Sequence, residues 1–169
     1  MSNIINKSTN QEEIVLQVRK AIEHRATWMY LLMNEARKRG LDWDDFARSA
    51  IFQCGCIHGT RFQEDINDLS NLEEFSKTFV PEITKKVFEM EFLEVDKEKF
   101  YVDFHYCPLV NAWQKLDLSD DEIDHLCDIG MDGDRGIASQ FPSFKFTLGH
   151  TIAQGYRSCQ VRFNKIDIE

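Results

Sequence analysis

Apolar residues recur at a helical period over residues 12–39. The members of this repeat are Ile14, Val18, Ile22, Trp28, Leu31 and Leu32. Their spacing predicts one long helix with this stripe facing a core. Thr9 and Glu12 have the spacing of a capping box at the start of the helix, and Gly40 stands where it should end.

Further helices are expected in the rest of the N-terminal half. Asp42 is placed to cap a second helix, whose pattern fades around Gly55 and Gly59. Ser70 begins another capping-box spacing before a third apolar repeat. Pro81 should divide that helix, because an interior proline removes a backbone hydrogen bond.

The pattern changes from helical to alternating near Phe88. Apolar positions fill residues 90–95 and alternate over residues 100–104, on either side of the charged residues 96–99. This arrangement predicts a β-hairpin.

The C-terminal part mixes helix and strand. A short helix is expected over residues 109–116, and Ser119 begins a longer one that Pro142 ends. Residues 144–148 and 159–163 alternate as strands. The fold class predicted is α+β, with a helical N-terminal half packed on a small antiparallel sheet that carries an inserted helix pair.

The chain is expected to form a single domain over residues 1–169, in which residues 1–10 are a flexible N-terminal segment. Its 29 Asp plus Glu against 20 Lys plus Arg give a net charge of −9, which argues against a nucleic-acid partner. No stretch approaches the ~18 apolar residues of a membrane span, and residues 1–10 lack the apolar core of a signal peptide. The five cysteines are therefore expected as reduced thiols in a cytoplasmic protein.

His105 and Cys107 are the first candidates for chemistry. On a strand both side chains would project to the same face, because side chains alternate with a period of two. Cys107 also precedes a predicted helix, whose dipole would lower the pKa of the thiol and favour the nucleophilic thiolate. The alternative is a buried cysteine beside a surface histidine.

Cys127, on the apolar side of its helix, is followed by a run rich in glycine and aspartate. The glycines of this run are Gly130, Gly133 and Gly136. Each costs about 1 kcal/mol in a helix relative to alanine, so we expect a close approach to the backbone by another element or by a ligand. Asp132 and Asp134 could act as general bases or bind a cationic group. The alternative is a frayed helix end with solvated acids.

Cys159 falls on the apolar face of the last strand, and Arg162 points the other way, as a surface charge or as a clamp for a carboxylate. Cys54 and Cys56 lie close to His58 but lack the paired C-x-x-C spacing of a structural zinc site. We interpret these two cysteines as small residues where a helix passes close to a neighbour.

The C-terminal half resembles a known family. Cys107-Pro108, the helix to Cys127, the string LGHTIAQG at 148–155 and the string CQVRF at 159–163 are similar in order and spacing to the L-2-amino-thiazoline-4-carboxylic acid hydrolase family. The resemblance covers roughly residues 88 to 165 in motif. This family is distantly similar to 4-vinyl reductase domains and TRAPP trafficking subunits, so the resemblance implies a fold like theirs.

Two positions depart from these patterns. Tyr156 stands where the family often has an aspartate after the glycine. Ile152 stands where many metal-binding 4-vinyl reductase relatives carry a cysteine, which weakens an all-cysteine zinc site.

The resemblance implies a hydrolase that opens a small cyclic amidine. We hypothesise that Cys107 is the nucleophile, or the ligand of a metal that activates water. His105 would be the nearby base or second ligand, and Asp134 the proton donor or the carboxylate that binds the amidine. If a metal is bound, we expect zinc, with Cys107, Cys127 and Cys159 as its ligands.

Substrate binding needs further groups. Asp132 would help to bind the amidine, and Arg135 or Arg162 would receive the carboxylate of this small-molecule substrate. The rival function is a non-catalytic ligand- or metal-binding accessory or sensor domain of the 4-vinyl reductase type. A third reading is a structural interaction domain, in which the helical half forms the face of a homodimer.

Overall fold

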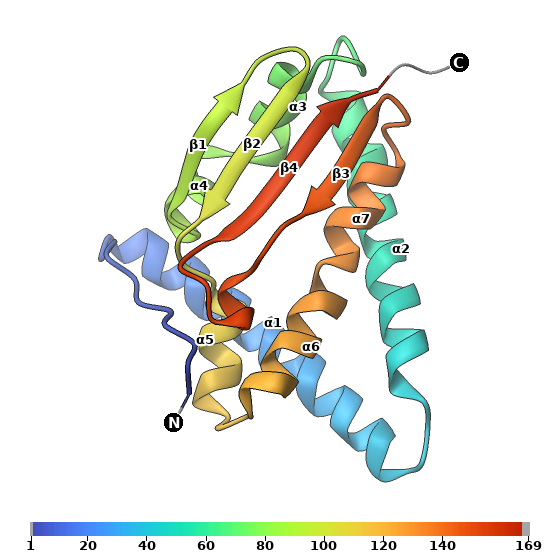
Figure 1. Cartoon of the computed structure of the whole chain (residues 1–169). Helices are drawn as coiled ribbons and strands as arrows, with labels where there is room; N and C mark the ends of the chain where they lie inside the picture. Colours follow the sequence, from blue (N-terminus) through green and yellow to red (C-terminus); the bar gives the residue numbers. More distant parts are fainter. Residues whose placement is uncertain (1, 167–169) are drawn as a thin grey trace.

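The computed structural model describes residues 2–166 and has an α+β fold, which confirms the predicted class (Figure 1). Its strands are β1 (Met90–Val95), β2 (Lys99–Phe104), β3 (Phe144–Leu148) and β4 (Cys159–Lys165). They form one sheet in the order β1-β2-β4-β3, and each neighbouring pair is antiparallel. The predicted hairpin and the two C-terminal strands are therefore confirmed.

The helices lie on one side of this sheet and cover the face with the buried side chains, which we call its inner face. They are α1 (Glu13–Lys38), α2 (Trp43–Glu64), α3 (Leu72–Phe79), α4 (Glu82–Val87), α5 (Pro108–Lys115), α6 (Asp120–Gly130), α7 (Asp132–Ser139) and the short 3-10 helix η1 (Ile152–Gln154). Pro81 separates α3 from α4, as predicted. None of the helices within residues 2–166 has the length and apolar character needed to cross a membrane.

An aromatic cluster joins the sheet to α3. The register sets Phe100 opposite Phe163 and Val102 opposite Val161, and all four side chains are buried. The ring of Phe75, on α3, lies against the rings of Phe79, Phe100, Phe141, Phe144 and Phe163. The buried faces of β2 and β4 thus form one wall of the core, and α3 packs against this wall.

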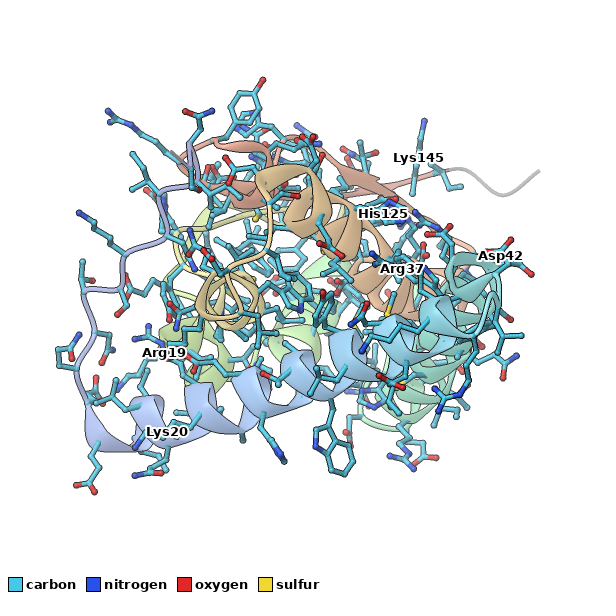
Figure 2. All side chains as sticks on the ribbon, turned by 90° about the horizontal axis from the view of Figure 1, so that it is seen from below. Arg19, Lys20, Arg37, Asp42, His125 and Lys145 are labelled. Atoms are coloured by element: carbon cyan, nitrogen blue, oxygen red, sulfur yellow. The ribbon has the colours of Figure 1, made fainter. Side chains whose placement is uncertain are left out.

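The predicted core stripe of α1 is wrong for most of its members. Trp28 and Leu32 are 63% and 69% exposed, and Ile14 and Leu31 are exposed as well. The buried positions are instead Val15, Arg19, Ala26 and Met33. Figure 2 shows Lys20 projecting away from the body of the molecule, next to the buried Arg19. Both faces of α1 carry apolar residues at helical spacing, so periodicity alone did not identify the inner one.

Two predicted helix caps are also corrected. Thr9 does not cap α1, because its amide and its hydroxyl both donate to Glu89, and the helix begins after Glu12 without a side-chain cap. Asn71, one residue after the predicted Ser70, caps α3. The caps at Asp42 and Ser119 are confirmed.

Helix α2 continues through Gly55 and Gly59 because these residues are its contact with α7. A Cβ added at Gly55 would lie 2.0 Å from the carbonyl oxygen of Gly133, and one added at Gly136 would lie 2.1 Å from the carbonyl oxygen of Phe52. Only glycine lets the two backbones come this close. The predicted fading of the helix near these glycines is therefore wrong, and the predicted close passage of a neighbour is confirmed.

The helix predicted from Ser119 to Pro142 is divided at Met131 into α6 and α7. Met131 keeps helical dihedral angles. The division places Cys127 and Asp134 on two successive helices that line one cavity.

Candidate functional site

A cavity of about 390 Å³ lies between the helices and the inner face of the sheet. Aromatic rings make much of its wall, namely Phe62, Phe79, Phe88, Phe104 and Trp113. A volume of this size is typical of small-molecule sites, which are mostly apolar with a few polar groups. The polar groups of this cavity are therefore the candidates for chemistry.

Three thiols open into this cavity from three different elements. Cys107 directly precedes α5, Cys127 lies on α6, and Cys159 begins β4 opposite Phe104. All three cysteines are buried, and none of them forms a disulfide. The structure thus brings together the three cysteines that the sequence singled out.

Burial raises the pKa of each thiol. The pKa of Cys159 rises to about 12, and that of Cys127 rises well above its ordinary value, with the neighbouring thiols adding to the burial effect. The pKa of Cys107 is also raised by burial, although the amides of Leu109 and Val110 in the first turn of α5 oppose the rise. The expected lowering by the helix dipole is outweighed, and Cys107 is a neutral thiol at neutral pH.

Across residues 2–166, no group of three or more His, Cys, Asp or Glu side chains is arranged to hold a metal ion. Sharing a cavity wall is not enough, since zinc needs its sulfur ligands at about 2.3 Å. The donor set does not fit the hypothesised zinc.

Asp134, on α7, supplies the acidic group of the cavity. Among the described residues it makes no hydrogen bond or ion pair with another side chain. Burial raises the pKa of its carboxyl group to about 6, and the charges of Arg135 and Arg25 oppose the rise. Asp134 is therefore an unpartnered carboxyl group that can gain or lose a proton near neutral pH.

Arg25 and His58 lie where this cavity meets a second one of about 330 Å³. Both are exposed on their helices, and both line the two cavities together with Asp134. The charge of Arg25 works against the rise in pKa of both Asp134 and Cys107. Arg25 thus lies near the two groups, at an opening of the cavity.

Asn6 holds the backbone of Cys107. Its Nδ2 donates to the carbonyl oxygen of Cys107 at 2.8 Å, and the amide of Cys107 donates to Asn6 Oδ1 at 2.9 Å. In the same segment Ile4 is buried and its carbonyl oxygen accepts from Gln114. The described part of the segment expected to be flexible, residues 2–10, therefore lies against the site.

His105 is separated from this cavity. Strand β2 ends at Phe104, so the interpretation that His105 and Cys107 share a strand face is wrong. The exposed ring of His105 has its Nε2 3.0 Å from Glu91 Oε2. Only Cys107 of this pair lines the cavity.

Asp132 and Arg135 are occupied by bonds within the protein. Arg135 donates to Asp128 Oδ1 at 2.7 Å and to Asp132 Oδ1 at 2.6 Å. Arg48, on α2, donates to the second oxygens of the same two carboxylates at 2.8 and 3.0 Å. This four-residue network joins α2, α6 and α7, and it leaves neither the acid nor the arginine free for a substrate.

Arg162 is on the opposite face of the sheet from the cavity. It pairs with Asp103 and donates to the carbonyl oxygen of Val102. Its neighbours in sequence, Val161 and Phe163, are buried on the inner face. Arg162 is indeed a clamp for a carboxylate, but the carboxylate belongs to the chain itself.

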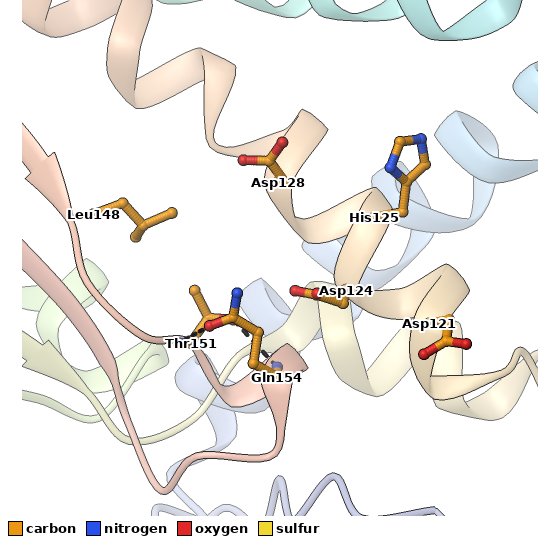
Figure 3. A pocket seen from close by; sticks show the side chains of 7 residues that line it. All are labelled: Asp121, Asp124, His125, Asp128, Leu148, Thr151 and Gln154. Carbon is orange, nitrogen blue, oxygen red and sulfur yellow. Dashed lines mark hydrogen bonds between the residues drawn. The ribbon is translucent and has the colours of Figure 1, made fainter.

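A separate acidic groove runs between α6 and η1 (Figure 3). Asp121, Asp124 and Asp128 line it together with His125. Asp128 already pairs with two arginines, and His125 pairs with Asp44 of α2. These ion pairs are within the protein, so the central cavity is the better candidate for function.

Arg25, His58 and Asn6 were missed as site residues by the sequence reasoning. Arg25 lies on a helix whose inner face the periodicity does not identify, and His58 is close in sequence to Cys54 and Cys56 but lines the cavity with Asp134. Asn6 makes contacts 101 residues away in the chain, which no local pattern indicates.

Comparison with known proteins supports the resemblance in the sequence. No curated protein and no solved structure matches the chain. The model of the L-2-amino-thiazoline-4-carboxylic acid hydrolase family, however, matches residues 19–163. This range extends well beyond the C-terminal motifs and contains every residue that lines the central cavity. The chain belongs to the L-2-amino-thiazoline-4-carboxylic acid hydrolase family.

Proposed function

We propose that this protein is a hydrolase that opens a small cyclic amidine, such as 2-amino-thiazoline-4-carboxylate, in the central cavity. The observation that carries the proposal is the unpartnered carboxyl group of Asp134 beside buried thiols in a largely apolar cavity. A cationic amidine is the natural partner for such a carboxylate, because a paired charge is far less costly to bury than a lone one.

Asp134 and Arg25 would orient the substrate. The carboxylate of Asp134 accepts hydrogen bonds from the amidine nitrogens, and bound positive charge favours its ionised form. Arg25 makes no ion pair with a described carboxylate, unlike Arg135 and Arg162, and it lies at the opening of the cavity. It is therefore the arginine we assign to the substrate carboxylate.

Cys107 is the nucleophile in this proposal. Its thiol adds to the amidine carbon and transfers its proton to Asp134, since a neutral thiol must lose a proton to react. The bond from that carbon to the ring nitrogen breaks, and Asp134 returns the proton to the departing nitrogen. Water then adds to the carbon held on Cys107 and gives a proton to Asp134. The bond from this carbon to Cys107 Sγ breaks, and Asp134 returns the proton to the departing thiolate, which releases an S-carbamoyl product and restores the thiol.

Ring opening by purified variants tests these roles. Asp134→Asn and Cys107→Ser should each lower kcat/KM by about a hundredfold or more, because each removes a group that transfers a proton or forms a bond in the transition state. Asp117→Asn is the matched control, since Asp117 is exposed and is not among the residues that line the cavity. Its kcat/KM should equal that of the wild type.

The result also separates the two roles. A Cys107→Ser protein that opens the ring at the wild-type rate would overturn the nucleophile and leave Asp134 to activate water. An Asp134→Asn protein with wild-type kcat/KM would overturn the site itself.

A further inference from the structure

The central cavity and its neighbour share a polar belt. Arg25, His58 and Asp134 line both cavities, and Gly130 lines both as well. Apart from the belt and the three thiols, the central cavity is lined mainly by the five aromatic rings already named and by Met90 and Met131, which together we call the aromatic lobe. Within residues 2–166, the only charged side chains that line this cavity are Arg25 and Asp134, and both belong to the belt.

This aromatic lobe is poorly matched to the ring named by the family. A thiazoline carboxylate is a single small ring with a charge at each end, and the belt alone provides both opposite charges. The lobe adds only apolar wall to the belt, in a cavity of about 390 Å³ that is large enough for a drug-sized ligand. Apolar surface of this kind stabilises an apolar group of the ligand rather than a charged one.

Gly130 lines both cavities and contributes no side chain to either of them. It ends α6, where glycine is about 1 kcal/mol less favourable than alanine. Close packing explains Gly55 and Gly136, whereas a Cβ added at Gly130 would have no atom within 4 Å. Its φ is not positive either. Neither packing nor backbone conformation requires a glycine here, and the absent side chain leaves open space on the wall of both cavities.

We propose that the ligand is a cyclic amidine that carries an apolar substituent, with its charged groups in the belt and its substituent passing Gly130 into the aromatic lobe. This inference rests on the proposed function for the amidine and extends it by naming the class of substituent. It makes Gly130 a residue that determines specificity.

Calorimetric titration of the full chain tests the apolar substituent. The probes are 2-amino-thiazoline-4-carboxylate and two benzyl derivatives of it, one substituted on the exocyclic nitrogen and one on the ring carbon next to sulfur. At least one derivative should bind about tenfold or more tightly than the parent, as expected for an apolar group that enters a fitting pocket. Equal or weaker binding of both derivatives would overturn the inference.

Gly130→Leu tests the route. The added side chain should fill the open space beside Gly130 and remove the advantage of the benzyl derivative, so that the ratio of its affinity to that of the parent falls to about one. Gly130→Ala serves as the folding control, since it should raise the Tm. A Gly130→Leu protein that keeps its Tm and still prefers the benzyl derivative as strongly as the wild type does would overturn the assignment of the lobe.

Ring-opening assays with the same probes keep this inference distinct from the proposed function. If the parent is opened and neither derivative is bound or opened better, the hydrolase proposal stands and the apolar substituent is refuted. If a derivative binds tightly in a manner that depends on Gly130 but no probe is opened, the ligand class stands and the hydrolase proposal is refuted.

Discussion

Asp134 is held where its charge is costly. The native environment raises the pKa of its carboxyl group from 3.8 to about 6, because burial penalises the ionised form. The native state therefore binds this proton more tightly than the unfolded chain does. The resulting stability is fully present below about pH 3.8 and is lost as the pH rises through about 6.

Asp134→Asn should consequently stabilise the fold at neutral pH. The amide cannot ionise, so we expect the free energy of unfolding to rise by about 3 kcal/mol at pH 7.5, with no gain near pH 3.5. Denaturant unfolding at a series of pH values measures the effect, and Asp45→Asn is the control, because Asp45 is exposed and its side chain makes no hydrogen bond or ion pair among the described residues. A gain that does not depend on pH would show that the charge of Asp134 is not the cause.

The sequence indicated which cysteines and which aspartate belong to the site, but not which arginine lies beside them. Cys107, Cys127, Cys159 and Asp134 were identified from local patterns, and the structure places all four on one cavity. Arg135 has the same charge as Arg25, but it faces two aspartates of its own helix pair. The distinction depends on which helices pack together, and a single sequence does not contain that information.

At the scale of elements, the crossing of α2 over α7 depends on two backbones in contact. Gly55→Ala would place a methyl group 2.0 Å from the carbonyl oxygen of Gly133, and this oxygen cannot move without its helix. We expect a loss of about 3 kcal/mol or more in the free energy of unfolding. Gly130→Ala, which has open space at its Cβ, should gain about 1 kcal/mol.

Denaturant midpoints of these two alanine variants provide the measurement, because the substitution is chemically identical in both. Equal midpoints would mean that the contact between α2 and α7 relaxes without cost, and the explanation of the glycines would fail.

The elements themselves differ in how well their patterns predicted them. Alternation over residues 100–104 gave the correct strand, since one face of an antiparallel strand is buried and period two leaves one choice. On α1 the choice was ambiguous. Trp28 and Leu32 are as regularly spaced as Ala26 and Met33, yet only the latter pair is buried. The inward stripe is the one that packs against α5, whose Trp113 donates to the carbonyl oxygen of Ala26.

At the scale of the whole molecule, the N-terminal segment connects elements that are distant in sequence. Glu89 accepts from the amides of Thr9 and Asn10 and pairs with the buried Arg19. Further along the same segment, Asn6 binds both backbone groups of Cys107. Asn6 lies outside residues 19–163, the range that the family model matches, whereas Cys107 lies within it.

Asn6→Ala should therefore loosen Cys107 without altering the cavity lining. The variant loses the two hydrogen bonds between the Asn6 side chain and the backbone of Cys107, worth about 1 kcal/mol each. This loss should raise the rate of Cys107 alkylation by iodoacetamide roughly tenfold or more. Mass spectrometry resolves this rate from those of Cys127 and Cys159. Asn3→Ala is the matched control, because the hydrogen bond from Asn3 to Asp120 uses the backbone amide and not the side chain. Equal alkylation rates in the wild type and Asn6→Ala would show that the chain between α5 and β2 holds Cys107 in place by itself.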